Sequence, residues 1–340
     1  MTQGADRNGE PQVEVLIRAP GGPPWRQTLG ESELRRFAAA RGDAVAARLA
    51  AQLDRARAAR AFAPGRARPW LMGIVNVTPD SFSDGGDHAT NAAAIGRGRA
   101  LADAGAAIVD VGGESTRPGA EAVTAKVEIG RVVPVIRALN DAGILVSIDS
   151  RKAAVMAAAV AAGAGLINDV SALRHDPESL AVARDSGVPV VLMHMRGEPA
   201  TMMDRTDYDD VVLDVFDGLE RRVAAAVAAG IGRDRLIIDP GIGFAKSAAQ
   251  NLELLRRLSL YRGLGLPLLL GVSRKSFIGR IAGGAPAKDR LPGSIAAALW
   301  GVAEGADGLR VHDVAECAQA VTLWRAIAAG GPDLPRPGEV

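Results

Sequence analysis

The chain has 340 residues, of which 48% are hydrophobic and 23% are charged, a composition typical of a folded protein with a sizeable core. This composition excludes an intrinsically disordered chain and a collagen-like repeat. The 40 Lys and Arg residues nearly balance the 39 Asp and Glu residues, and only 4% of the residues are aromatic. A net charge of +1 argues against nucleic acid as a partner, because no overall positive field attracts phosphate. The single cysteine, Cys317, excludes an internal disulfide and a cysteine-rich metal cluster.

Residues 1–68 are expected to form an extension that precedes the main domain. Its first part is rich in Pro, Gly and polar residues and shows an apolar alternation only at Val13–Ile17. The Ala-rich stretch over about 31–62 has apolar residues at helical spacing and predicts one helix. Pro64 and Pro69 mark the end of the extension. We therefore predict an extension that is largely helical and partly flexible.

The sequence also predicts where the protein resides. Its first residues, MTQGADRNGEPQ, include acids and lack the apolar core of a secretory signal. The longest uncharged apolar stretch, 153–167, is too short to span a bilayer. We expect a soluble, cytoplasmic protein with no membrane partner.

From Trp70 onward, short apolar runs alternate with helical segments. The runs are Leu71–Val77, Ala107–Val111, Ile144–Ile148, Gly165–Val170, Val188–Met193, Leu236–Ile238, Leu268–Val272 and Gly308–Val311. The helical segments are 92–104, 121–141, 151–162, 177–185, 207–229, 248–258, 291–304 and 313–329. Nearly continuous apolar strands between helices are typical of a parallel sheet. We therefore predict a single α/β domain over 69–330, a (β/α)₈ TIM barrel rather than a doubly wound sheet, followed by a tail at 331–340.

A polar residue stands at or just after the carboxyl end of every predicted strand. In chain order these residues are Asn76, Asp110, Asp149, Asn168, His194, Asp239, Ser273 and Arg310. A barrel gathers these strand ends on one face, where active sites of this fold are built. Some polar residues nearby, such as Ser171 and Asp313, are explained equally well as helix caps.

Three cations at strand ends are not explained by helix capping. Arg117, Lys275 and Arg310 each precede a predicted helix, and a cation is unfavourable at a helix N-terminus. Cations that converge on one barrel mouth favour an anion-binding site.

Two carboxylates in the predicted mouth point to the chemistry of a ligand. Asp149 and Asp239 are expected to lie deep, with Asn168 nearby, and buried carboxylates need partners. A ligand with an amidine-like N–H edge, such as a pterin or a guanine, satisfies both. The alternative is that the two aspartates only hold Lys275 and backbone amides.

The histidines and the glycine-rich loops add weaker signals. Loops 78–86 and 112–119 are long for their place in a barrel and are expected to close over a substrate. The histidines do not suggest a zinc site. His194 follows an apolar run and is expected to be a hydrogen-bonded wall residue, whereas His312 stands beside Arg310 and is the functional candidate.

Eight segments of the chain together resemble the dihydropteroate synthase family over about residues 70–330. They are LMGIVNVTPDSFSDGG (71–86), VDVGGESTRPGA (109–120), SIDS (147–150), INDVSAL (167–173), LMHMRGEP (192–199), IIDPGIGF (237–244), GVSRKSFIG (271–279) and RVHDV (310–314). So many matches in the same order are highly specific. The resemblance implies a TIM-barrel transferase of folate biosynthesis and a sulfonamide target. The implied reaction condenses (7,8-dihydropterin-6-yl)methyl diphosphate with p-aminobenzoate to 7,8-dihydropteroate and diphosphate.

The resemblance also assigns roles to individual residues. For the pterin they are Asp149, Asn168, Met193, Asp239, Phe244 and Lys275. For the diphosphate they are Arg117, Arg310 and His312. For p-aminobenzoate and the closing loops they are Phe82, Asp84, Thr116, Pro118 and Ser276. Asn76 is implied as a ligand of Mg²⁺, whose remaining ligands are diphosphate oxygens and water. The family is usually homodimeric, and its substitution is dissociative and assisted by magnesium.

Two features depart from the family pattern, and two other functions are alternatives to the synthase. The family usually has Gly where this chain has Ala245, a change that costs little unless φ is positive there. The extension has no counterpart in shorter family members. A methyltetrahydrofolate–corrinoid methyltransferase shares the barrel and the pterin pocket but has no diphosphate to bind. A catalytically silent pterin-binding paralogue is expected to have lost loop residues that this chain keeps.

Overall fold

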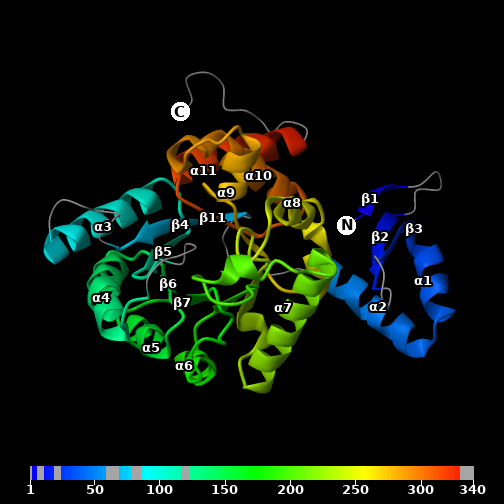
Figure 1. The fold of residues 1–340 in the computed structure, drawn as a ribbon, viewed down its shortest axis with the longest axis horizontal. Helices are drawn as coiled ribbons and strands as arrows, with labels where there is room; N and C mark the ends of the chain where they lie inside the picture. Colours follow the sequence, from blue (N-terminus) through cyan, green and yellow to red (C-terminus); the bar gives the residue numbers. More distant parts are fainter. Residues whose placement is uncertain are drawn as a thin grey trace.

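The protein is described by a computed structural model whose main unit is an eight-stranded barrel (Figure 1). The structure describes residues 2–5, 11–18, 24–58, 69–78, 86–115 and 122–329. The barrel strands are β4 (Trp70–Asn76), β5 (Ile108–Gly112), β6 (Val146–Asp149), β7 (Leu166–Asp169), β8 (Val190–Met193), β9 (Leu236–Asp239), β10 (Leu269–Gly271) and β11 (Gly308–Val311). They lie in the order β10-β11-β4-β5-β6-β7-β8-β9, and a parallel bridge between Ile238 and Leu268 closes the sheet. The predicted TIM barrel is confirmed, and the doubly wound sheet is excluded.

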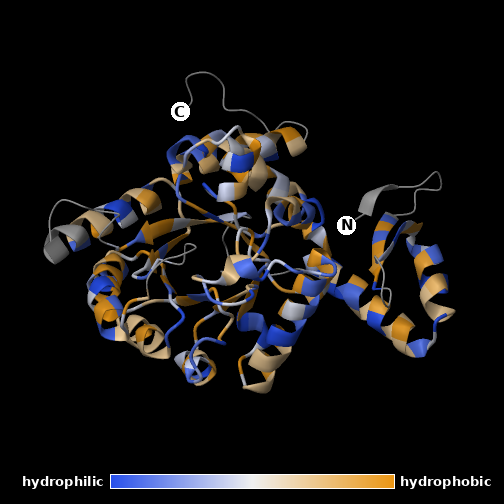
Figure 2. Cartoon of the chain, viewed as in Figure 1, coloured by the Kyte–Doolittle hydropathy of each residue, from blue (hydrophilic) through white to orange (hydrophobic). Residues whose placement is uncertain are grey.

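Helices cover the outside of the barrel. They are α3 (Gly86–Asp103), α4 (Ala125–Asp141), α5 (Ala153–Ala161), α6 (Ser179–Ser186), α7 (Val211–Ala228), α8 (Ala248–Arg256), α9 (Ser276–Ile281), α10 (Leu291–Ala303) and α11 (Val314–Ala328). Single-turn and longer 3₁₀ segments are η2 (Met202–Asp204), η3 (Arg233–Arg235), η4 (Leu258–Leu264) and η5 (Ala287–Asp289). Hydrophobic residues run along the strands, while hydrophobic and hydrophilic residues alternate on the helices (Figure 2). In the described part of the chain, none of these helices has the length and apolarity needed to cross a membrane.

The interior of the barrel is filled by one apolar layer. This layer consists of Trp70, Met72, Ile108, Leu166, Val191, Ile237 and Leu269. Side chains alternate between the two faces of a strand, so a residue two positions further on also points into the barrel. The polar strand ends therefore lie directly above an apolar floor.

The extension has helices over much of the predicted stretch, together with a sheet that the sequence did not predict. It contains a three-stranded antiparallel sheet of β1 (Thr2–Ala5), β2 (Pro11–Ile17) and β3 (Trp25–Gly30). Two helices follow, α1 (Glu31–Ala39) and α2 (Asp43–Arg57). The single helix predicted over 31–62 is interrupted because Gly42 takes a φ of +102°, which helical residues do not adopt. Residues 59–62 of that prediction and the predicted tail at 331–340 lie outside the described residues.

A small apolar core of its own explains why the extension forms strands. Leu29, Leu34 and Leu53 are buried, and Val13 and Val15 of β2 pack against them. The apolar alternation at Val13–Ile17 was therefore the signal of a strand with one buried face.

The extension rests against the outside of the barrel. The Arg26 guanidinium lies 2.8 Å from Asp210 at the start of α7 and 2.8 Å from Glu253 of α8. Arg55 of α2 donates through Nε to the Gly263 carbonyl of η4 at 3.0 Å. These ion pairs are partly exposed, so each contributes little to the stability of the folded protein. The hydrogen bond from Arg55 to the Gly263 carbonyl fixes the orientation of α2.

Candidate functional site

The mouth of the barrel collects charged side chains immediately above the apolar layer. Asp110, Asn168 and Asp239 each stand two residues after a layer residue on β5, β7 and β9. Asp149 ends β6, and Arg310 lies on β11. Exposure falls between 0% for Asp110 and 7% for Asp149, so the carboxylates are held in a nearly dry site.

Arg310 joins two of these carboxylates. Its Nε lies 2.6 Å from Asp110 Oδ2 and its Nη2 lies 2.7 Å from Asp149 Oδ2. Asn168 Nδ2 donates to the same oxygen of Asp110 at 3.0 Å. Among the described residues, the Oδ1 atoms of Asp110 and Asp149 are buried without a hydrogen-bond partner. Buried acceptors without partners are costly, so the site is prepared for a ligand that brings N–H donors.

Asp110 is a site residue that the sequence reasoning noted at a strand end but did not assign. Its signal was its position two residues after Ile108, on the strand next to the one that carries Asp149. Its partner in register on β6 is Ser147, and Asp149 follows two residues later on the same face of that strand.

The charges in the mouth shift one another's protonation. Burial raises the pKa of Asp149 to about 7, although the Arg310 guanidinium opposes the shift. Burial also raises the pKa of Asp239, against the opposing charge of Lys275. Burial lowers the pKa of Lys275 to about 8, while Asp239 works in the other direction. Asp149 and Lys275 therefore change charge near neutral pH, which is typical of functional sites.

The loop after β9 carries the apolar wall and the lysine's partners. Lys275 Nζ donates to the Ile242 carbonyl and lies 4.7 Å from the centroid of the Phe244 ring. Gly241 has a φ of +69°, and a Cβ there would meet the His194 carbonyl oxygen at 2.0 Å. Only glycine permits this close approach, which brings the loop against the end of β8.

Met193 lies in the small cluster that backs this wall. The cluster consists of Val170, Met193, Met195, Met202 and Ala245, with Phe244 packed against it. Flexible methionine side chains fill irregular space and pack well against flat rings. Met193 thus belongs to the apolar cluster against which Phe244 packs.

Ala245 does adopt a positive φ, +52°. A left-handed conformation costs an alanine about 1 kcal/mol relative to glycine. Its methyl group is fully buried in the methionine cluster, which returns roughly 0.8 kcal/mol. The two effects nearly offset each other, which explains how the substitution is accommodated.

A buried lysine holds the same loop in place. Lys246 Nζ donates to the carbonyls of Gly241 and Phe244, each at 2.9 Å, and to that of His194 at 3.2 Å. His194 Nδ1 lies 3.3 Å from the same nitrogen. Burial lowers the pKa of Lys246 well below its usual value, and burial likewise lowers that of His194. His194 is thus a hydrogen-bonded wall residue.

The other predicted residues lie at the rim of the mouth or outside the described part. His312 Nδ1 is 3.0 Å from Ser273 Oγ, and Ser276 begins the six-residue helix α9. Asn76 is half-buried at the end of β4, in register with Gly112 of β5. Residues outside the described part are Phe82, Asp84, Thr116, Arg117 and Pro118.

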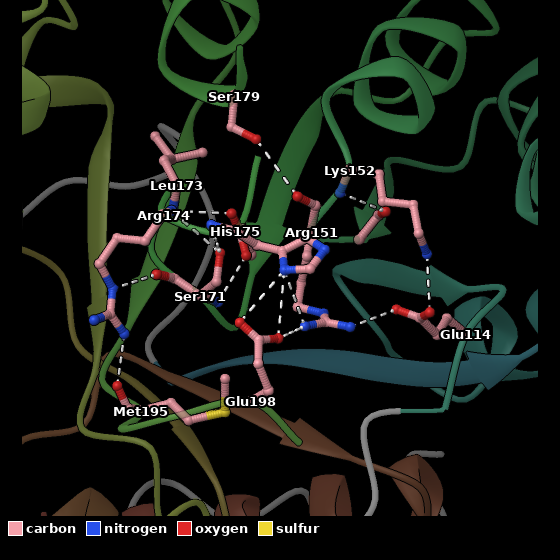
Figure 3. Close-up of polar contacts among 12 residues, drawn as sticks. Glu114, Arg151, Lys152, Ser171, Leu173, Arg174, His175, Ser179, Met195 and Glu198 are labelled. Carbon is pink, nitrogen blue, oxygen red and sulfur yellow. Dashed lines mark hydrogen bonds and ion pairs between the residues drawn. The ribbon is translucent and has the colours of Figure 1, made fainter. Parts of the chain in front are cut away.

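A charge network that the sequence did not predict ties several rim loops together (Figure 3). Arg151, just after β6, donates to Glu114 at 3.0 Å and also to Glu198 beyond β8. Lys152 binds Glu114 at 2.9 Å, and Val123 N donates to the same carboxylate at 3.1 Å. Despite burial, the Lys152 ammonium and these hydrogen bonds keep the pKa of Glu114 below its usual value. Glu114 thus fixes both described ends of the loop that carries Arg117.

Known proteins share both the sequence and the fold of the barrel. Residues 72–312 match the family described as pterin binding enzyme. A dihydropteroate synthase of Synechocystis sp. is 46% identical over 263 residues, which cover 76% of this chain and 91% of that protein.

Two solved structures of Xanthomonas albilineans dihydropteroate synthase are similar to this fold. The one with 4-aminobenzoic acid has a TM-score of 0.73 at 50% identity and covers 79% of this chain and 94% of that one. The one with 7,8-dihydropteroate has a TM-score of 0.71 at 48% identity, and the match covers 79% of this chain and 95% of that one.

Proposed function

We propose a residue-level account of catalysis for this chain, which belongs to the dihydropteroate synthases of the pterin-binding enzyme family. In the proposed reaction, the nitrogen of p-aminobenzoate bonds to the methylene carbon of (7,8-dihydropterin-6-yl)methyl diphosphate. The bond from that carbon to the diphosphate oxygen breaks, and the arylamine proton passes to water. The observation that carries the proposal is the pair of buried oxygens on Asp110 and Asp149 that have no hydrogen-bond partner among the described residues.

The pterin occupies the barrel mouth in this account. Its N–H groups donate to the Oδ1 atoms of Asp110 and Asp149 and to Asp239, while Asn168 offers both a donor and an acceptor. Met193 and Phe244 pack beside the ring. Lys275, whose Nζ lies 4.7 Å from the centroid of the Phe244 ring, donates to an oxygen or nitrogen acceptor of the pterin ring.

The leaving diphosphate lies toward the rim, where we place Arg310, His312 and Arg117. Arg310 contacts the two aspartates through Nε and Nη2, and its Nη1, which has no partner in the described part of the chain, is proposed to bind a phosphate oxygen. Asn76 offers a neutral amide oxygen, a donor type that Mg²⁺ accepts together with phosphate oxygens and water. The ion would neutralise charge that develops on the diphosphate.

The substitution is proposed to be dissociative, with the carbon–oxygen bond breaking before the arylamine attacks. The carboxylates of Asp110 and Asp149 lie in a nearly dry site, where they stabilise the pterin cation electrostatically. A neutral arylamine is already a nucleophile, so the site needs no strong general base. Phe82, Asp84, Thr116, Pro118 and Ser276 are proposed to shape the p-aminobenzoate site.

Product formation tests the proposed function. Purified protein with both substrates and Mg²⁺ is expected to form dihydropteroate and to release diphosphate in equal amounts, and a sulfonamide is expected to compete with p-aminobenzoate. Tight pterin binding without turnover would instead indicate the silent paralogue. Methyl transfer from methyltetrahydrofolate to a corrinoid, without use of the diphosphate, would indicate the methyltransferase.

Pterin binding is expected to follow a bell-shaped dependence on pH. The ligand's N–H donors require ionised Asp149, so affinity rises as pH approaches about 7 and that carboxyl loses its proton. Affinity falls above about pH 8, where Lys275 loses its charge. Calorimetry with a pterin analogue that does not itself ionise in this range measures both limbs. Asp149→Asn should remove the acid limb and Lys275→Met the alkaline limb, whereas a flat profile in the unaltered protein would contradict the assignment.

We further propose a homodimer that forms through barrel helices. Trp300 of α10 and Leu323 and Ile327 of α11 are exposed apolar side chains on two helices that pack together. Leu323→Asp is expected to convert the dimer to a monomer in sedimentation equilibrium with no change in the circular dichroism spectrum. A protein that already sediments as a monomer before substitution would overturn this proposal.

The remaining proposals concern organisation and location. Residues 1–68 are proposed to be an appendage and residues 69–330 the catalytic unit. A cytoplasmic location is supported by the cysteine content. Cys317 is the sole cysteine in the sequence and is buried, so the protein has no internal disulfide of the kind common in secreted proteins.

A further inference from the structure

A cavity of about 340 Å³ lies between the end of β8, the segment that follows it, and helix α7. Four arginines line it, Arg174, Arg196, Arg221 and Arg222, against one carboxylate, Asp214. His194 and Gly218 form part of its floor. A Cβ added at Gly218 would lie 2.7 Å from the His194 ring, so the absence of a side chain at this position keeps the floor open.

The positive charge of the lining is not neutralised from within. Asp214 is already bound by Arg196 at 3.2 Å and by Arg18 of the extension at 2.8 Å. With four guanidinium groups and one carboxylate, the lining carries a charge of +3. Such an excess around a cavity attracts a counter-ion.

Two of the arginines also keep an Nη1 group that no group in the described part of the chain uses. Arg222 donates to the carbonyls of Ala172 and Leu173 through Nε and Nη2 only. Arg174 likewise donates through Nε and Nη2, to the carbonyls of Ser171 and Met195 (Figure 3). Both are therefore fixed in direction by the backbone and retain Nη1.

Arg221 is the least constrained of the four. It is exposed at the edge of the cavity, and within the described ranges it makes no hydrogen bond or ion pair. Its guanidinium stands near the cavity floor, because a Cβ at Gly218 would lie 4.0 Å from its Nη2.

The pKa shifts of Arg222 and His194 are those expected of groups close to several cations. Burial lowers the pKa of Arg222, and the neighbouring Arg174 lowers it further. Burial, Lys246, Arg196 and Arg174 together lower the pKa of His194, so its ring is neutral in this setting. Mutual repulsion among the cations is relieved when an anion is bound.

We propose that this cavity is a second anion site, built for a phosphate group. Guanidinium forks with fixed planes match phosphate oxygens in pairs, which a point charge does not. The site is distinct from the proposed diphosphate position, because its described lining includes none of Asn76, Arg310 and His312. Its ligand is a small phosphate-bearing anion, either a free phosphate or diphosphate or the phosphate of a larger molecule.

Calorimetric titration with inorganic phosphate, diphosphate and a nucleoside diphosphate tests the proposal. Arg221→Glu is expected to weaken binding at one site at least about tenfold, since it reverses a charge without removing a structural contact. The matched control is Arg137→Glu on α4, an exposed helical arginine outside the cavity, which should leave both sites intact.

Two further readouts separate the cavity from the barrel mouth. Arg310→Gln is expected to remove the mouth's share of diphosphate binding and to leave the cavity's share, whereas Arg221→Glu does the reverse. Equal affinity for the three probes identifies a free phosphate or diphosphate as the ligand, and tighter nucleotide binding identifies the phosphate of a larger molecule. Identical isotherms for Arg221→Glu and Arg137→Glu with every probe would overturn the proposal.

Discussion

Replacing Arg310 by Gln is expected to reduce kcat/KM about a thousandfold or more and to destabilise the protein by about 3 kcal/mol. Arg310 is the only described side chain that forms an ion pair with Asp110 or Asp149. Without it, two buried carboxylates lie close together with no neutralising charge. The same substitution removes the donor proposed for the leaving diphosphate, so catalysis and folding are both impaired.

Steady-state kinetics and urea denaturation measure the two effects. Arg280→Gln, at an exposed arginine of α9, is the matched control and should change neither quantity appreciably. A kcat/KM for Arg310→Gln within about tenfold of that of the unaltered protein would contradict the role proposed for Arg310 in catalysis.

Replacing Asp149 by Asn is expected to weaken pterin binding about a hundredfold while leaving the ligand-free protein as stable as before, or more so. The lost binding follows from the loss of a charged acceptor to the ligand's N–H groups. The stability follows from the raised pKa, because the folded state disfavours the ionised carboxylate. A group whose pKa is raised on folding lowers stability once pH exceeds its unfolded value, and Asn resembles the neutral form.

Calorimetry and thermal denaturation at about pH 8 test this pair of expectations. At that pH the unaltered carboxylate is ionised, so the stability difference is at its largest. Asp239→Asn is a useful comparison, since Oδ1 of Asp239 also accepts from Gly241 N and the amide keeps that acceptor. Unchanged pterin affinity in Asp149→Asn would contradict the proposed pocket.

The barrel and most of its mouth were predictable from the sequence. The carboxyl ends of the strands in a barrel meet on one face for any side-chain orientation, so Asp149, Asn168 and Asp239 are expected on that face. Helix α9 was not predicted, because six residues give too short a pattern for helical periodicity.

What the sequence did not predict depends on orientation and on distant contacts. Arg310 was assigned to the anion side, but its guanidinium also turns toward Asp110 and Asp149, and strand position alone does not fix that direction. Strand β3 has few apolar residues, and it forms because β2 pairs with it along its whole length. The cavity beside α7 joins arginines that are far apart in the chain.

The structure of this protein with a bound dihydropterin tests the central claim most directly. The account expects ring N–H groups at about 2.7–2.9 Å from the Oδ1 atoms of Asp110 and Asp149, which otherwise have no partner in the described part of the chain. It also expects the ring to lie beside Met193 and Phe244. A ring bound elsewhere, with those two oxygens still unpartnered, would contradict it.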